Sequence, residues 1–220
     1  MPRTPNTQER RQQIVDGLRQ VIATSGYAGA TIAAIAKAAG LAPGLIHYHF
    51  RDKREILVAL VQALAGYARE RYARRAAAAT DAAERLRAYV DARLAYGADA
   101  QPDAVAAWVM IGEQAVQDAD VREVYQSAIG DEMQLVRRLL KACYAERGKR
   151  VHQLDHLVAA VMAFVEGAFV LATNARPLLP AGFAAPMALA WIERYIDAEP
   201  DRPGPGAGTK KRAATKAKSR

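Results

Sequence analysis

The sequence is poor in cysteine and in aromatic residues. Of its 220 residues, only Cys143 is a cysteine and 7% are aromatic. A single cysteine excludes an intramolecular disulfide, so we expect a reducing, cytoplasmic setting. No uninterrupted apolar run approaches the roughly 18 residues of a membrane span, and we expect no membrane association. The N-terminus, MPRTPNTQERR, carries charge with no apolar segment behind it, which argues against a signal peptide.

The motifs of common catalytic sites are also missing. There is no glycine-rich phosphate loop after a strand, no nucleophile elbow and no histidine beside Cys143 in the sequence. His152 and His156 lie four residues apart on an expected helix, a spacing that could hold a metal ion. No further cysteine or histidine lies nearby, and an exposed pair is the preferred interpretation. We therefore expect no catalytic function, no metal and no cofactor.

Negative charge is scarce at both ends of the chain. The net charge is +8, with +5 in residues 1–54, −2 in residues 55–198 and +5 in residues 199–220. Clusters of Lys and Arg attract the phosphates of nucleic acids, although many basic proteins bind none. The charge pattern therefore favours a nucleic-acid contact at one end of the chain without establishing it.

What is present is helical periodicity, most informative between residues 31 and 53. A first short helix is apolar at Ile32, Ile35 and Ala39. Gly40 can supply the positive φ of a helix C-terminus, and Pro43 suits the first turn of a second helix. Ile46 and Phe50 lie four apart on one face of that helix. This pattern predicts a helix-turn-helix motif over residues 31–50, in which the second helix enters the DNA major groove.

The rest of the chain also reads as helices only. Amphipathic spacing predicts a helix over 8–25, broken at Gly26, and further helices over 52–79, 81–97, 152–174 and 185–197, with another starting at Pro102. Residues 118–147 are expected to form one helix or two. We predict an all-α fold with a flexible N-terminus (1–7), a three-helix DNA-binding domain (8–54), a larger helical domain (55–198) and a disordered basic tail (199–220). The tail either adds nonspecific affinity for phosphates or has no role.

The first fifty-odd residues resemble the N-terminal domain of the TetR family of bacterial transcriptional regulators. The resemblance rests on Thr31, Ile32, Ile35, Ala36, Ala39, Gly40, Leu41, Gly44, Tyr48, His49, Phe50 and Lys53. The C-terminal part is more weakly similar to the branch of that family that includes the regulator of choline-to-betaine conversion. The family pattern implies an operator of double-stranded DNA with palindromic or nearly palindromic half-sites.

The resemblance also implies DNA-binding roles for eight residues. Thr31 would hold a phosphate at a helix N-terminus, and Lys53 matches a phosphate-binding lysine. The recognition helix would present the others to bases or backbone: Pro43, Gly44, Leu45, His47, Tyr48 and His49. Packing of Tyr48 on a neighbouring helix and a merely solvated His49 remain alternatives. Arg10 and Arg11 are candidates for flanking phosphates.

Two features depart from the family pattern. Ala42 stands where a Ser or Thr cap is common, so the recognition helix should lack a side-chain N-cap. Leu45 and His47 replace the usual Thr and Tyr, which changes what the groove-facing surface can contact. The operator sequence therefore cannot be taken from a relative.

By the same resemblance, the larger domain should dimerise through its last two helices and bind a small molecule. The cavity is expected among residues 56–173, although each candidate lining residue is more often plain core: Tyr89, Tyr96, Trp108, Tyr125, Met133 and Phe164. Glu113 and Glu166 are carboxylates in apolar helical stretches and need partners. Arg93 or Arg137 is the ordinary partner, and a cationic effector held by aromatic faces is the sharper hypothesis.

These expectations combine into a ligand-responsive DNA-binding regulator, a repressor that its effector releases from the operator. An activator on the same fold is the first alternative. The second is a helical small-molecule-binding protein or enzyme that binds no specific DNA.

Overall fold

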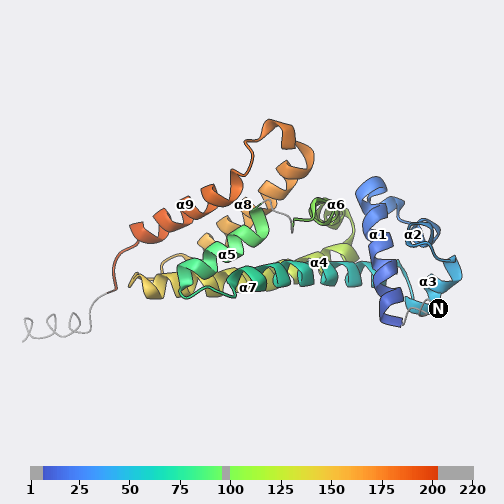
Figure 1. Cartoon of the computed structure of the whole chain (residues 1–220), viewed down its shortest axis with the longest axis horizontal. Coiled ribbons are helices and arrows are strands. Elements are labelled where there is room, and N and C mark those ends of the chain that lie inside the picture. Colours follow the sequence, from blue (N-terminus) through green and yellow to red (C-terminus); the bar gives the residue numbers. More distant parts are fainter. Residues whose placement is uncertain (1–6, 96–99, 203–220) are drawn as a thin grey trace, which may run out of the picture.

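The computed structural model describes residues 7–95 and 100–202. Within these ranges every secondary-structure element is a helix. The prediction of an all-α fold is confirmed. The molecule is elongated, with α1–α3 at one end and α5, α8 and α9 toward the other (Figure 1). The N-terminal residues 1–6, the segment 96–99 and the basic tail beyond residue 202 lie outside the described residues, and so does Tyr96.

The N-terminal head consists of α1 (Thr7–Gly29), α2 (Ile32–Ala39) and α3 (Pro43–His49). A close approach between α1 and α2 holds it together. A Cβ atom at Gly17 would lie 2.9 Å from the carbonyl oxygen of Ile35 and 3.0 Å from Ala39, so only glycine fits there. Farther along α1, Gly26 has a φ of 68° and kinks the helix near the position where the sequence predicted a break.

The body consists of the remaining six α-helices of the described residues. They are α4 (Lys53–Ala76), α5 (Ala82–Leu94), α6 (Pro102–Gln117), α7 (Ala119–Glu146), α8 (Leu154–Asn174) and α9 (Ala184–Ala198), with a short 3-10 turn at Arg176–Leu178. α6 packs against α1 of the head on one side and against α7 and α8 on the other. It therefore lies between the head and the core of the body.

Local capping explains where several helices begin. Asp52 caps α4 by accepting from the backbone N–H of Glu55 at 2.8 Å, as the sequence predicted. Pro102 begins α6. One predicted start is wrong, because α8 begins at Leu154 and Gln153 has a positive φ of 47°. His152 therefore precedes the helix. His152 and His156 are both exposed, which agrees with the preferred interpretation of this pair.

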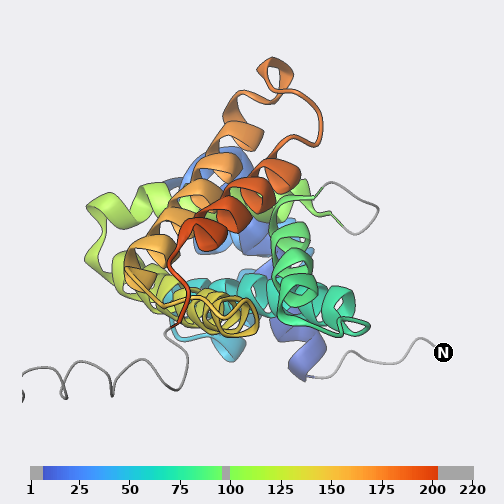
Figure 2. The same ribbon diagram turned by 90° about the vertical axis from the view of Figure 1, so that its left-hand side faces the viewer.

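α8 differs from its neighbours in how much apolar surface it leaves open. Among the described residues it is the one helix long and apolar enough to cross a membrane by composition, although buried helices of soluble proteins pass the same test. This differs from the prediction that no apolar run of the sequence approaches the length of a membrane span. α8 and α9 lie side by side across one face of the body (Figure 2). The exposed apolar residues of α8 are Ala159, Ala160, Ala163, Val170 and Leu171.

The end of the body remote from the head is closed by a backbone bridge. Residues 148–150 pair with residues 200–202, through Arg150 N–H to the Pro200 carbonyl and Arg202 N–H to the Gly148 carbonyl, both at 2.8 Å. Nearby, Cys143 is 1% exposed and its thiol donates to the Ala82 carbonyl at 3.4 Å. Burial raises the pKa of the Cys143 thiol to about 11.

Candidate functional sites

The recognition helix α3 separates a buried face from an open one. Ile46 is fully buried and Phe50 is 2% exposed, whereas Tyr48 is 79% exposed. Gly40 adopts the predicted left-handed conformation, with a φ of 64°, and directs the chain from α2 into α3. Ala42 provides no side-chain cap, as expected. The helix is therefore held by its buried face and by the turn before it.

The predicted recognition residues lie together on the open face. Pro43, Gly44, His47 and Tyr48 are exposed, and Leu45 and His49 are half-buried. The ring of Tyr48 meets that of His49 edge-on, with centroids 5.0 Å apart. The alternative in which Tyr48 packs on a neighbouring helix is wrong, because such packing would bury the ring. A groove-facing role for these residues stays a prediction.

Two predicted phosphate contacts already have partners inside the head. The Thr31 hydroxyl caps α2 by accepting from the N–H of Ala34 at 3.1 Å, which leaves its own proton to donate. The Lys53 ammonium donates to the Tyr27 carbonyl at 3.2 Å and lies 4.1 Å from the centre of the Tyr27 ring. Lys53 therefore joins α4 to the end of α1, and its remaining donors are what a phosphate would meet.

Arg11 has a structural position that sequence reasoning missed. Its guanidinium lies 4.0 Å from the centre of the Phe50 ring, donates to the His49 carbonyl and pairs with Glu55 at 3.4 Å. Arg11 therefore ties α1 to the C-terminus of the recognition helix and to α4. Its contact with a flanking phosphate stays a prediction.

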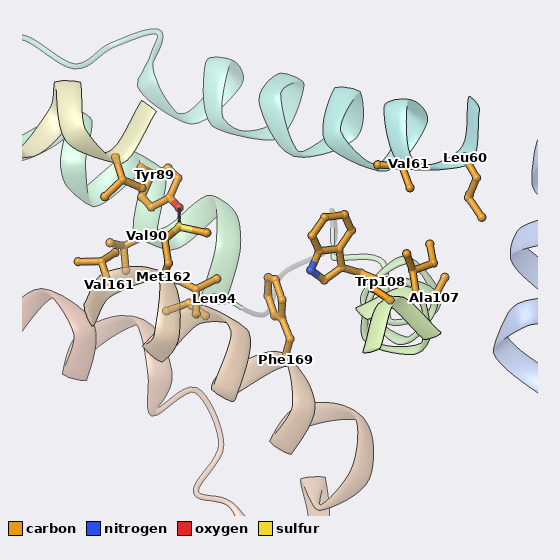
Figure 3. Packing of buried hydrophobic residues seen from close by; sticks show 14 of the residues in the cluster. Leu60, Val61, Tyr89, Val90, Leu94, Ala107, Trp108, Val161, Met162 and Phe169 are labelled. Atoms are coloured by element: carbon orange, nitrogen blue, oxygen red, sulfur yellow. Dashed lines mark hydrogen bonds between the residues drawn. The ribbon is translucent and has the colours of Figure 1, made fainter. Parts of the chain in front are cut away.

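A cavity of about 380 Å³ lies in the body between α4, α5, α6, α7 and α8. Most of its lining is apolar, and this volume falls in the usual range for small-molecule sites. Trp108 on α6 and Phe169 on α8 both line it, and both side chains point into the same region of the body (Figure 3). The cavity lies among residues 56–173, as predicted, and also reaches Phe183 and Ala184.

Among the predicted lining residues that the structure describes, only one contacts the cavity directly. Trp108 lines it. Tyr89 is buried against Met162, to which its hydroxyl donates at 4.0 Å, and Phe164 packs on Trp191 with centroids 6.3 Å apart. Met133 is half-buried outside the cavity, and Tyr96 lies outside the described residues. Glu113 is exposed, so the expectation of a buried carboxylate there is wrong.

Glu166 lies behind the Trp108 wall and has partners other than those expected. The Trp108 indole N–H donates to Glu166 Oε2 at 2.9 Å, and the Tyr125 hydroxyl donates to the same oxygen at 3.2 Å. The Tyr125 ring also packs on Trp108, with centroids 4.9 Å apart. An arginine partner was the ordinary expectation and is wrong, because Arg93 pairs with Glu132 and Arg137 with Asp155.

Burial controls the ionisation of this cluster. It raises the pKa of Glu166, while the hydrogen bond from Trp108, the charge of Arg93 and the Tyr125 hydroxyl oppose that shift. Burial and the nearby Glu166 carboxylate raise the pKa of Tyr125, which keeps that phenol neutral and able to donate. The arrangement fixes the edge of the Trp108 ring and leaves the ring in the cavity wall.

The residues of the cavity wall that sequence reasoning missed include Arg93, Glu132 and Phe169. Arg93 was considered only as a partner for a buried carboxylate. Glu132 lies three residues after Ile129 and four before Val136, so it is an acid within the apolar stripe of α7. That interruption was the available signal. Phe169 had no comparable signal, because nearly every side of α8 is apolar in sequence.

Comparison with known proteins gives two family matches that together span most of the chain. Residues 14–60 match the bacterial regulatory proteins of the tetR family, and residues 82–200 match the C-terminal domain of BetI-type transcriptional repressors. The chain is 27% identical over 202 residues to the HTH-type transcriptional regulator BetI of Rhizobium meliloti, covering 90% of this chain and 93% of that protein.

Solved structures share the fold at lower identity. A protein described as a TetR-family transcriptional regulator from Rhodococcus sp. is 20% identical and superimposes with a TM-score of 0.75, covering 86% of this chain and 99% of its own. A transcriptional regulator from Saccharomonospora viridis, solved in complex with choline, is 22% identical with a TM-score of 0.68, covering 89% and 100%. The chain therefore belongs to the TetR family of bacterial regulatory proteins and is a helix-turn-helix transcriptional regulator with a BetI-type C-terminal domain.

Proposed function

We propose that this regulator is a repressor that a small molecule carrying a cationic group releases from its operator. The observation that carries the proposal is the position of α6. Trp108 on α6 lines the cavity, while the same helix packs against α1 of the head. A Cβ atom at the kinked Gly26 of α1 would lie 3.6 Å from the Met110 side chain of α6. A ligand that displaces α6 therefore acts on the head directly.

The chemistry of the Trp108 wall supports a cationic group. An indole face attracts cations through its quadrupole, and a carboxylate that accepts from the indole N–H adds negative potential at the edge of the ring. Glu166 occupies that position. The choline held by the Saccharomonospora viridis protein is a cation of this class. These points support an effector with a quaternary ammonium group bound near Trp108.

Homodimerisation through α8 and α9 completes the proposal. A helix that leaves an apolar face open needs a second surface to cover it. Val170 and Leu171 on α8 are each 44% exposed, and Met187 on α9 is 56% exposed. A two-fold dimer would place two heads on two half-sites of a palindromic operator. The effector would then favour a head spacing that does not fit the operator, which is a population shift.

The test is binding to the intergenic DNA upstream of the chain's own gene, measured at several salt concentrations. We expect salt-sensitive binding that is tighter than binding to random DNA of the same length. His47→Ala and Tyr48→Ala should each weaken it by about 1–3 kcal/mol if they contact bases, whereas the exposed His156→Ala should not. Equal affinity for random DNA would contradict the proposal. Transcription in vitro on the same fragment separates a repressor from an activator.

A further inference from the structure

The wall of the cavity already contains a cation. Arg93, in the last turn of α5, places its guanidinium carbon 5.3 Å from the centre of the Phe169 ring. Its Nε lies 3.2 Å from Glu132 Oε1, and the two side chains are 14% and 15% exposed. A carboxylate beside an aromatic face is an arrangement that binds ammonium groups. Here the guanidinium of Arg93 lies between the Glu132 carboxylate and the Phe169 ring.

This ion pair is incompletely hydrogen-bonded. The Nε–H of Arg93 is not directed at Glu132 Oε1, and both atoms are buried without a hydrogen-bond partner in the described part of the chain. The Arg93 side chain donates no hydrogen bond to any described residue. Arg71, which also lines the cavity, is different, because it donates to the Ala92 carbonyl at 2.5 Å and to the Ala95 carbonyl at 2.7 Å. Arg93 therefore offers a guanidinium with unused donors, a group that matches a carboxylate in shape and charge.

Charge balance limits what can bind beside this pair. A simple cation that takes Glu132 leaves Arg93 buried without its counter-ion. A simple anion that pairs with Arg93 leaves Glu132 buried without its counter-ion. Removing one partner from a buried ion pair is strongly unfavourable, because the remaining charge stays desolvated. A ligand that carries both charges leaves neither residue unpaired.

We propose that the effector is a zwitterion, whose cationic group lies against Trp108 and Glu132 and whose carboxylate accepts hydrogen bonds from Arg93. This inference rests on the proposed function and narrows its ligand class. Arg93 is then the residue that determines specificity, because it distinguishes a zwitterion from a simple ammonium ion. One ligand can reach all three residues, because Arg93, Trp108 and Glu132 line the same cavity.

Four small probes of matched shape separate the two charges. Glycine betaine carries both charges and choline only the cation. In the two tert-butyl analogues a carbon atom replaces the ammonium nitrogen. 3,3-Dimethylbutanoate therefore carries only the negative charge, and 3,3-dimethylbutanol carries no charge. Titration calorimetry with the full-length protein should rank glycine betaine first and the neutral alcohol last. Choline binding as tightly as glycine betaine, or more tightly, would overturn the inference.

Substitutions then assign the carboxylate to Arg93. We expect Arg93→Gln to weaken the binding of glycine betaine about tenfold or more, as the loss of hydrogen bonds to a charged group predicts. Choline should bind at least as tightly as to the wild type, because Glu132 no longer has a counter-ion to give up. Arg87→Gln is the control, because Arg87 is on the same helix but its side chain is 58% exposed and pairs with Glu193. Equal weakening of both ligands by Arg93→Gln contradicts the proposal.

Folding and function are monitored separately. Thermal melting and ligand-free operator binding show whether each variant is intact. If Arg93→Gln does not fold, Arg93→Lys keeps the charge without the planar guanidinium and should still weaken glycine betaine more than choline. If none of the four probes binds at millimolar concentration, the zwitterion and the trimethylammonium effector are both overturned. Operator binding, which needs no ligand, then still decides the DNA-binding part of the proposed function.

Discussion

The indole N–H of Trp108 donates to Glu166 Oε2 at 2.9 Å and so connects α6 to α8 at the cavity wall. Because the edge of the ring is held in this way, its orientation toward the cavity is fixed before any ligand arrives. Tyr125 adds a second donor from α7 to the same oxygen. Three helices therefore meet at one carboxylate, and the protonation state of that carboxylate should affect the stability of the body.

The first prediction concerns pH. Burial raises the pKa of Glu166 above its ordinary value of 4.5, so the folded chain keeps this proton to a higher pH than the unfolded chain does. Over the interval above 4.5 the folded state binds more protons, and stability falls as pH rises. The melting temperature of the wild type should therefore decline relative to that of Glu166→Gln from about pH 4.5 upward. Glu113→Gln, an exposed acid on α6, serves as the control. Parallel pH profiles for wild type and Glu166→Gln would contradict the assignment.

The second prediction concerns the contact between α1 and α2. Gly17→Ala should lower the free energy of unfolding by about 1–3 kcal/mol, because the new methyl group would overlap the Ile35 carbonyl. Gly130→Ala on α7 meets open space and should be neutral or stabilising by up to about 1 kcal/mol. Urea denaturation measures both. A Gly17→Ala variant as stable as the wild type would show that the two helices separate easily.

The third prediction distinguishes two neighbouring arginines. Arg11→Ala removes contacts to Phe50, His49 and Glu55 and should destabilise the chain by about 1–2 kcal/mol. Arg10→Ala loses only a hydrogen bond to Gln13 among the described residues and should change stability little. Thermal melting without DNA is the measurement. Equal melting temperatures for the two variants would contradict a stabilising role for the contacts of Arg11.

The fourth prediction concerns self-association. Val170→Glu places a charge on the open apolar face of α8 and should convert the proposed dimer to a monomer. Val116→Glu, at a valine of α6 that is 73% exposed, should leave the dimer intact. Light scattering coupled to gel filtration gives the masses. A Val170→Glu variant that remains dimeric would place the interface elsewhere.

Local chemistry explains why most elements could be predicted from sequence. Asp52, Gly40 and Pro102 act within one turn of chain, so their effects on helix ends are visible without the fold. The same holds for the buried and open faces of α3, which follow from helical periodicity. The predicted start of α8 was wrong because Gln153 adopts a positive φ, which its residue type gives no reason to expect.

The cavity was harder to predict because its wall is assembled from six helices, α4 to α9. Periodicity says that a residue is buried, but it does not say whether another side chain or an empty volume lies beside it. Tyr89 is buried against Met162 and the half-buried Phe164 packs on Trp191, whereas Phe169 lines the cavity. The partner of Glu166 was missed for the same reason, since Trp108 and Tyr125 reach it from other helices.

Burial of Cys143 has a consequence for spectroscopy. Thiol-specific labels react with an exposed thiolate, which acts as the nucleophile, and the Cys143 side chain is neither exposed nor ionised near neutral pH. A cysteine introduced at Arg51, whose side chain is 89% exposed just after the recognition helix, would therefore take up a spin label selectively without removal of Cys143. The separation between the two labels in a dimer would then report the spacing of the heads directly, with and without ligand.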